Sequence, residues 1–106
     1  MRAGDFLFVS GEGPLDAEGR IVGEDVAAQT RVTMRNLARI LAAAGASFDN
    51  VVKATVFLAT MDHYHAFNAA YGEFVTRPFP ARICVAAGGL YEGILVEVDV
   101  IAYLGE

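Results

Sequence analysis

Three ionisable side chains stand inside two apolar segments near the end of this sequence. Arg82 lies in residues 81–87, and Glu97 and Asp99 lie in residues 94–102. Charged groups are expensive to desolvate, and apolar replacements often stabilise a protein as well, so a structural role explains these residues poorly. An arginine can hold a small carboxylate in a two-point contact, and a glutamate can orient an attacking water. Arg82 and Glu97 are therefore the candidate catalytic residues, with a plain cross-strand ion pair as the alternative.

The distance between these groups depends on how the two segments pair. We expect both to be strands of one hairpin, closed about the glycine-rich residues 88–93. Alternation then places Arg82 opposite Asp99 and diagonal to Glu97, about 7–8 Å away at the backbone. A gap of that size suits a small organic acid and one water molecule. A slip of one residue in the register would remove this arrangement.

Ser10, Gly11 and Asn68 are candidate substrate-binding residues. Gly11 follows an apolar strand, and a glycine there allows backbone N–H groups to approach a ligand closely. Asn68 lies between Tyr64 and Tyr71, at the border of an apolar helix stripe. The alternatives are an ordinary turn at Ser10–Gly11 and an amide bonded to nearby backbone at Asn68.

Cys84 is the single cysteine and shares a strand face with Arg82. A cysteine nucleophile needs an activating base, and no sequence pattern places His63 or His65 near it. The two histidines point away from each other on a helix, so they do not supply converging zinc ligands. We therefore expect Cys84 to line a pocket without acting as a nucleophile, and we expect no metal site.

The length and composition predict one globular domain over residues 1–106. Hydrophobic residues make up 55% of the chain, which excludes a disordered protein. No stretch approaches the roughly 20 apolar residues of a membrane span, and the first residues do not form a signal peptide. A single cysteine suits a reducing compartment, so we expect a cytoplasmic protein with no membrane partner.

The charge balance disfavours nucleic-acid binding. The net charge is −5 and the isoelectric point is near 4.9, so the surface repels phosphate backbones. Arg31, Arg35 and Arg39 nevertheless form a basic row at helical spacing. We interpret the row as a solvated face or as partners of nearby acids, and an RNA contact remains the alternative.

The hydrophobic pattern predicts an α+β sandwich. Two amphipathic helices are expected, one over residues 24–44 with Gly45 at its C-cap and one over residues 63–75 capped by Asp62. Residues 20–22 are expected to return as a short partner strand. Four segments rich in β-branched residues are expected as the other strands: 5–10, 51–59, 81–87 and 94–102. The order is ββαβαββ, with two helices on one face of a mixed sheet.

Apolar side chains fall on both faces of the strands expected over 51–59 and 94–102. Two helices can cover only one face of the sheet, so the other face would be an exposed apolar patch. This pattern predicts a homo-oligomer.

Over residues 4–104 the chain resembles the RidA (YjgF-type) family of imine and enamine deaminases. The matching stretches are Phe8–Gly11 with Pro14, Gln29–Thr30, Asn36–Leu37, Ala44–Ser47, Val51–Leu58, Asn68–Tyr71, Pro80–Arg82 and Val96–Ala102. Each stretch is weak alone, but their order and spacing are specific together. The most telling pair is Pro-Ala-Arg followed by the last strand with its glutamate.

The resemblance implies a chorismate-mutase-like fold and a homotrimer with pockets at the subunit interfaces. It also implies hydrolysis of 2-imino acids and their 2-enamino tautomers to 2-keto acids and ammonia, with no metal or organic cofactor. By the match, Arg82 would hold the carboxylate and Glu97 would position the water, while Ser10, Gly11, Asn68 and Cys84 would line the pocket. The connection before Pro80 is short for the family, which bears on substrate size. A non-catalytic module that senses keto or amino acids in the same pocket is the alternative.

Overall fold

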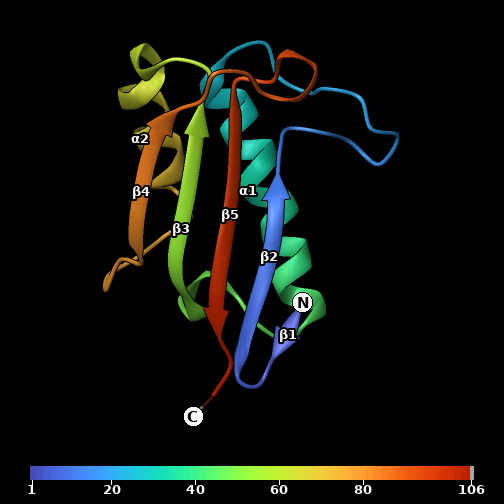
Figure 1. Cartoon of the computed structure of the whole chain (residues 1–106), viewed down its shortest axis with the longest axis vertical. Coiled ribbons are helices and arrows are strands. Elements are labelled where there is room, and N and C mark those ends of the chain that lie inside the picture. Colours follow the sequence, from blue (N-terminus) through green and yellow to red (C-terminus); the bar gives the residue numbers. More distant parts are fainter. Residues whose placement is uncertain (106) are drawn as a thin grey trace.

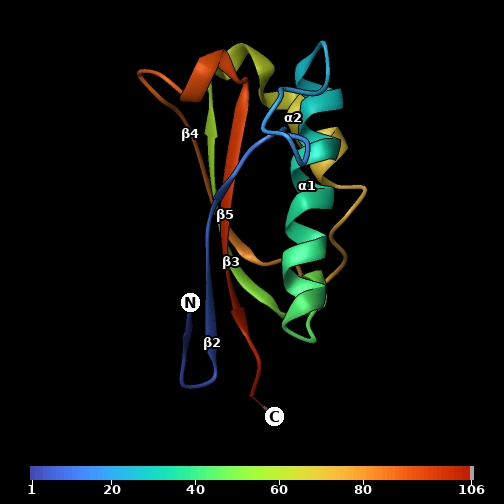
Figure 2. The same cartoon turned by 90° about the vertical axis from the view of Figure 1, so that its right-hand side faces the viewer.

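Both helices lie against one face of a five-stranded sheet (Figure 1 and Figure 2). The structure, a computed structural model, describes residues 1–105. The strands are β1 (Arg2–Ala3), β2 (Phe6–Glu12), β3 (Val51–Leu58), β4 (Ala81–Ala86) and β5 (Val96–Tyr103). The helices are α1 (Val26–Ala43) and α2 (Tyr64–Tyr71), and short 3₁₀ turns cover Phe48–Asn50, Met61–His63 and Tyr91–Gly93. The predicted ββαβαββ order and the two-layer α+β architecture are confirmed.

The strand order is β1-β2-β5-β3-β4, so β3 lies between β4 and β5. The predicted hairpin of β4 with β5 is therefore wrong. β4 pairs only with β3, in parallel, and α2 forms the crossover between these two strands. The connection from Ala87 to Leu95 is longer than the two to five residues of an ordinary hairpin loop, and it carries the chain past β3 to its far side. Alternation in a sequence determines which face a side chain takes, but not which strand is its neighbour.

Two smaller expectations about the elements are also wrong. The predicted partner strand at residues 20–22 is only an isolated bridge between Leu15 and Ile21, and β2 pairs instead with β1. Asp62 does not cap the second helix, because the Thr60 side chain accepts the N–H of Asp62 and begins a 3₁₀ turn there. The first helix ends one residue earlier than predicted, at Ala43 with Ala44 as its C-cap, and Gly45 follows in the left-handed conformation with a φ of 76°.

The core lies between the two helices and the sheet face that they cover. Alternate residues of β5 point into it, and so do Ala54, Val56 and Leu58 of β3. Leu37, Leu41 and Met34 of α1 and Phe67 of α2 are fully buried against them. This packing fixes α2 over β3 and β4, which matters for the candidate site below.

The opposite face of the sheet has no covering element within residues 1–105 (Figure 2). Several large apolar side chains of that face are exposed, among them Phe8 of β2 and Ile83 and Val85 of β4. A soluble monomer rarely leaves so many apolar side chains of one sheet in water. Within the described residues neither helix is long and apolar enough to cross a membrane.

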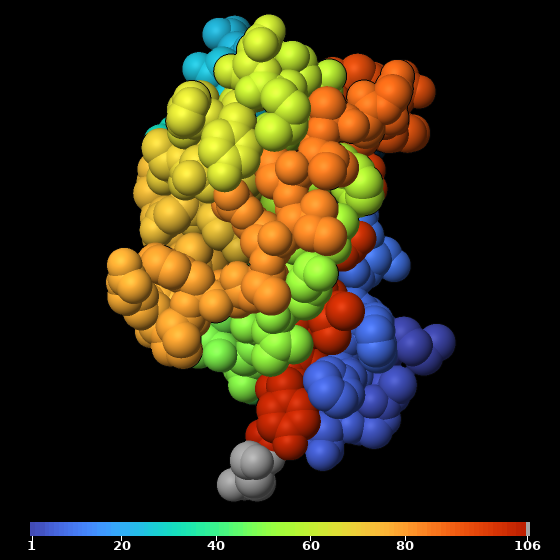
Figure 3. Space-filling model, turned by 60° about the vertical axis from the view of Figure 1, so that its left-hand side comes forward, coloured from blue at the N-terminus to red at the C-terminus, as the bar shows by residue number. Residues whose placement is uncertain are grey.

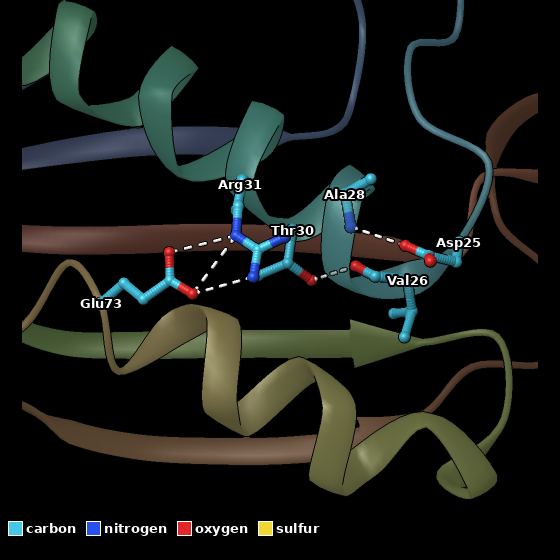
Figure 4. Close-up of polar contacts among 6 residues, drawn as sticks. All are labelled: Asp25, Val26, Ala28, Thr30, Arg31 and Glu73. Carbon is cyan, nitrogen blue, oxygen red and sulfur yellow. Dashed lines mark hydrogen bonds and ion pairs between the residues drawn. The ribbon is translucent and has the colours of Figure 1, made fainter.

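The first turns of α1 are held by side-chain contacts that Figure 4 shows. The Asp25 carboxylate accepts the N–H of Ala28 at 2.8 Å, which satisfies a donor that the helix leaves free at its start. One turn later the Arg31 guanidinium donates two nitrogens to the Glu73 carboxylate, at 2.9–3.2 Å. This ion pair joins α1 to the segment that follows α2.

Glu73→Gln is expected to lower the melting temperature at pH 7 and to have no effect in acid. The hydrogen bond from Arg31 lowers the pKa of the Glu73 carboxyl below its ordinary value of 4.5. A carboxyl with a lowered folded pKa stabilises the fold above its unfolded pKa, and this contribution is lost as the pH falls through the folded pKa. Thermal melts at pH 7 and at successive values below 4.5 measure the difference. Glu24→Gln, which removes a glutamate without an ion pair in residues 1–105, is the control.

Gln29→Ala is expected to destabilise the protein by about 1–3 kcal/mol. The buried Gln29 side chain donates to the Gly23 carbonyl at 3.1 Å and accepts the N–H of Leu95 at 2.8 Å. Truncation to alanine removes the hydrogen-bond partner of two partly buried backbone groups, the Gly23 carbonyl and the Leu95 N–H. Urea denaturation measures the loss, with Arg35→Ala on the exposed side of the same helix as control. A loss no larger than the control's would contradict this role.

Candidate functional site

Arg82 lies on β4, an edge strand, and points to the helix side of the sheet. Its partner across the β3–β4 pair is Ala54, which is buried under the helices. The guanidinium carbon lies 4.9 Å from the ring centre of Tyr71, 5.5 Å from that of Phe67 and 5.8 Å from that of Tyr64. One guanidinium nitrogen donates to the Tyr64 hydroxyl at 3.2 Å. Three rings of α2 therefore fix the direction of this side chain.

The charge of Arg82 has no acidic partner within residues 1–105. The rings attract the cation through their electron-rich faces, but they leave most of its N–H donors without an acceptor. A half-buried arginine held in this way is prepared to receive a carboxylate, because the donors are already oriented. The plain ion pair considered from the sequence is not formed.

A hollow of about 270 Å³ opens beside Arg82, between the end of α2 and the start of β4. Figure 3 shows this face, with β4 in orange beside α2 in yellow. Asn68 and Arg82 are its polar residues, and the rest of the lining is Tyr71, Gly72, Val75, Phe79 and Pro80. The structure thus brings together two of the residues singled out from the sequence, Arg82 and Asn68.

Cys84 follows Arg82 on the same face of β4, opposite Val56. Burial raises the pKa of its thiol, and the nearby charge of Arg82 opposes this in part. A thiol with a raised pKa carries little thiolate at neutral pH, so Cys84 is a poor nucleophile. Its position beside Arg82 agrees with a role in the lining of the site.

Glu97 lies on the other face of the sheet. It pairs with Phe57 across the β5–β3 ladder, in the row of side chains that the helices do not cover. Its carboxylate lies over Gly11, where a Cβ atom would come within 2.4 Å of Glu97 Oε2. The ladder of β2 with β5 is irregular between Val9 and Glu12, so Ser10 and Gly11 sit in a bulge. The bulge and the missing side chain of Gly11 make room for the carboxylate.

Arg82 and Glu97 are not diagonal neighbours, which corrects the geometry expected from the hairpin. Arg82 pairs with Ala54 of β3, and both side chains lie on the face of the sheet that the helices cover. Glu97 pairs with Phe57 of β3, and both side chains lie on the opposite face of the sheet, away from the helices. One chain therefore presents two separate groups: Asn68, Arg82 and Cys84 on the helix side, and Ser10, Gly11 and Glu97 at the other face.

The sequence interpretation missed the aromatic rings around Arg82. Tyr64, Phe67 and Tyr71 were expected only as the core stripe of the second helix. The two tyrosine hydroxyls in this stripe need hydrogen-bond partners, but that requirement alone does not distinguish a site from an ordinary core stripe. The Tyr71 hydroxyl is buried without a partner in residues 1–105, and burial raises its pKa against the opposing charge of Arg82.

Residues 1–105 contain no group of three or more His, Cys, Asp or Glu side chains placed to hold a metal ion.

Comparison with known proteins gives consistent relatives over almost the whole chain. Residues 1–104 match the family described as Endoribonuclease L-PSP. A RutC family protein of Pyrococcus horikoshii is 39% identical over 104 residues, covering 97% of this chain and 82% of that protein. Protein HMF1 of Saccharomyces cerevisiae is 32% identical over 102 residues, covering 96% of this chain and 79% of that protein.

Solved structures agree with the sequence relatives. The crystal structure of RidA from an Antarctic Psychrobacter matches with a TM-score of 0.92 and 29% identity, over 97% of this chain and 84% of that one. Rv2704 of Mycobacterium tuberculosis, titled a member of the YjgF/YER057c/UK114 family, matches with a TM-score of 0.85 and 26% identity, over 96% and 81% of the two chains. The resemblance to RidA read from the sequence is confirmed. The chain belongs to the Endoribonuclease L-PSP family, and the solved structures that it resembles include proteins described as RidA and as a member of the YjgF/YER057c/UK114 family.

Proposed function

We propose that this protein hydrolyses small 2-imino acids and their 2-enamino tautomers to 2-keto acids and ammonia, without a metal or organic cofactor. The observation that supports this most is Arg82, which faces a hollow and has no acidic partner within residues 1–105. Its oriented donors suit the carboxylate that every such substrate carries. Asn68 lines the same hollow, and Cys84 lies two residues beyond Arg82 on the same face of β4, so both are proposed as substrate-binding residues.

We further propose that the complete site forms between copies of the chain, in a homotrimer. Arg82 of one copy would meet Glu97, Ser10 and Gly11 of a neighbouring copy, because a single chain holds the two groups on opposite faces of its sheet. The exposed apolar side chains of the helix-free face support an assembly that covers them. A closed ring of identical copies would repeat one such contact at every interface.

In the proposed reaction Arg82 holds the substrate carboxylate, and Glu97 accepts a proton from a water that attacks C2. A bond forms between the water oxygen and C2, and the C=N π electrons move to nitrogen, which takes up the proton that Glu97 removed from the water, so that the Glu97 carboxylate is restored. The resulting carbinolamine passes its hydroxyl proton toward the nitrogen, the C–N bond breaks, and the C=O bond forms as ammonia leaves. Imines hydrolyse readily, so positioning and a general base, worth roughly 10²–10⁴-fold, are sufficient.

A threonine dehydratase coupled to this protein tests the proposal, because its product passes through 2-iminobutanoate. Semicarbazide is added as a competing trap for the imine, and 2-ketobutanoate and ammonia are followed. The protein should raise keto-acid formation at the expense of the semicarbazone. Rates equal to those in buffer would mean that it is not an imine deaminase. Binding of 2-ketobutanoate in calorimetry, without any acceleration, would favour a sensing module instead.

The description of the family favours RNA cleavage as a second candidate. Its electrostatic basis in this chain is weak, because the net charge is −5 and the basic row on α1 is partly engaged. Arg31 pairs with Glu73, and Arg39 donates to the Asn36 side chain. Incubation of the same preparation with labelled RNA tests it. Cleavage that is sensitive to salt and lost in Arg35→Ala would support this second function.

A further inference from the structure

We propose that the hollow beside Arg82 is a side-chain pocket that makes the enzyme prefer 2-imino acids with branched or aromatic side chains over those with a methyl side chain. This inference rests on the proposed deaminase function and names the substrates within that class. It follows from the volume and the lining of the hollow, which combines the polar side chains of Asn68 and Arg82 with the apolar side chains of Val75, Phe79 and Pro80.

The polar and apolar parts of the lining match the two parts of such a substrate. Arg82 and Asn68 supply donors that a carboxylate would accept. Val75, Phe79 and Pro80 supply an apolar wall from the segment that follows α2. Val75 is 8% exposed and fixed in the core, whereas Phe79 is 57% exposed and gives an outer wall that a ligand could cover. The Arg77 guanidinium lies 5.0 Å from the Phe79 ring centre and supports this wall from outside.

The size of the hollow exceeds what the smallest substrates need. Its volume of about 270 Å³ is close to the lower end of the range for pockets that hold drug-sized ligands, roughly 300–1,000 Å³. An acid with a methyl side chain would leave most of this space to water lying against apolar walls. A branched or aromatic side chain would displace that water and bury its own apolar surface, which is favourable.

Gly72 is one of the residues that line the hollow. It ends α2 with φ −62° and ψ −16°, a helical conformation that any residue can adopt, so the backbone does not require glycine there. A Cβ atom at Gly72 would meet only backbone oxygens, Asn68 O at 3.3 Å and Ala69 O at 3.6 Å. A larger side chain at this position can therefore be built without disturbing the core, and it would occupy the hollow.

The test compares three imino acids that an L-amino-acid oxidase generates in the assay from alanine, leucine and phenylalanine. Catalase is present to remove hydrogen peroxide. Clearance of each imine is measured against the semicarbazide trap. For the wild type, kcat/KM should be roughly 10-fold or more higher for the leucine- and phenylalanine-derived imines than for the alanine-derived one. Gly72→Leu should reduce this ratio to near one. Ala69→Leu, an exposed change on the same helix outside the hollow, should leave the ratio at the wild-type value.

Two further measurements separate failure of this inference from failure of the proposed function. If the wild type clears all imines but the ratio is near one, or Gly72→Leu leaves it unchanged, the pocket inference is wrong and the deaminase function stands. If no imine is cleared, the deaminase function is wrong. The pocket is then judged by thermal shift with 4-methyl-2-oxopentanoate, and no shift in the wild type would overturn it. If Gly72→Leu does not fold, Phe79→Ala takes its place in the test. This substitution removes an exposed wall of the hollow without changing the core, and it should lower the same ratio of kcat/KM values.

Discussion

Arg82→Ala is expected to lower kcat/KM for imine clearance by roughly 10- to 150-fold, because a charge-assisted contact to the substrate carboxylate contributes about 1.5–3 kcal/mol. The loss should be large because the guanidinium is already oriented by three rings and has no acidic partner to release within residues 1–105. Arg82→Lys should recover little of it. An ammonium keeps the charge but not the planar pair of donors, and it stacks less well on Tyr71.

The measurement is the dehydratase assay with semicarbazide, carried out on both variants and on Arg35→Ala. Arg35 is exposed on α1, so its replacement removes a positive charge without touching the hollow. Circular dichroism and thermal melts check that each variant is folded. If Arg82→Ala cleared imines as fast as the Arg35 control, the carboxylate would be held elsewhere and the site would have to be placed anew.

The sequence was sufficient to predict the elements whose pattern is determined locally. α1 follows from a stripe of apolar residues with a 3.6-residue period, an aspartate at its start and Gly45 after its end. β3 and β5 follow from alternation and β-branched content. Alternation correctly groups Ala54, Val56 and Leu58 on one face of β3, but at the start of the strand Val51 is buried and Val52 exposed, because the register with β5 shifts between Val51 and Lys53.

The sequence was not sufficient to predict which strands are neighbours. β4 and β5 are consecutive in the chain, and a hairpin is the usual result for such a pair. The parallel pairing of β4 with β3 depends on where α2 packs, which is a property of the whole core and not of either strand. The predicted distance from Arg82 to Glu97 failed because the hairpin would place both side chains on one face of the sheet, whereas the pairing of both strands with β3 places them on opposite faces.

The residues of the candidate site were likewise predictable from the sequence only in part. Arg82 and Asn68 could be chosen because their types are unusual where they stand. The rings of Tyr64, Phe67 and Tyr71 could not, because aromatic residues on a helix stripe usually fill the core. Only the fold shows that this stripe lies beside an edge strand carrying an arginine. A residue that serves both the core and a site has no separate signature in one sequence.

Glu97→Gln is expected to lower kcat by roughly 10²–10⁴-fold, because the amide can still hold a water but cannot accept its proton. The substitution keeps the size of the side chain, so it preserves the close fit over Gly11. Asp99→Asn is the matched control, since Asp99 lies two residues along β5 on the same uncovered face. The expected pattern is a loss confined to Glu97→Gln in the semicarbazide assay. Equal losses in both variants would indicate that the charge of the face matters, and not a base at Glu97.

Mixing Arg82→Ala with Glu97→Gln extends this prediction to the assembly, because the two residues lie on opposite faces of one chain. If each site combines Arg82 of one copy with Glu97 of another, co-refolded mixtures contain intact sites that neither variant forms alone. At equal amounts about a quarter of the sites should be intact, and activity should return to about that fraction of wild type. The separately folded variants, mixed without exchange, give the baseline. Activity that stays at this baseline after verified exchange of subunits would mean that the two side chains never share a site.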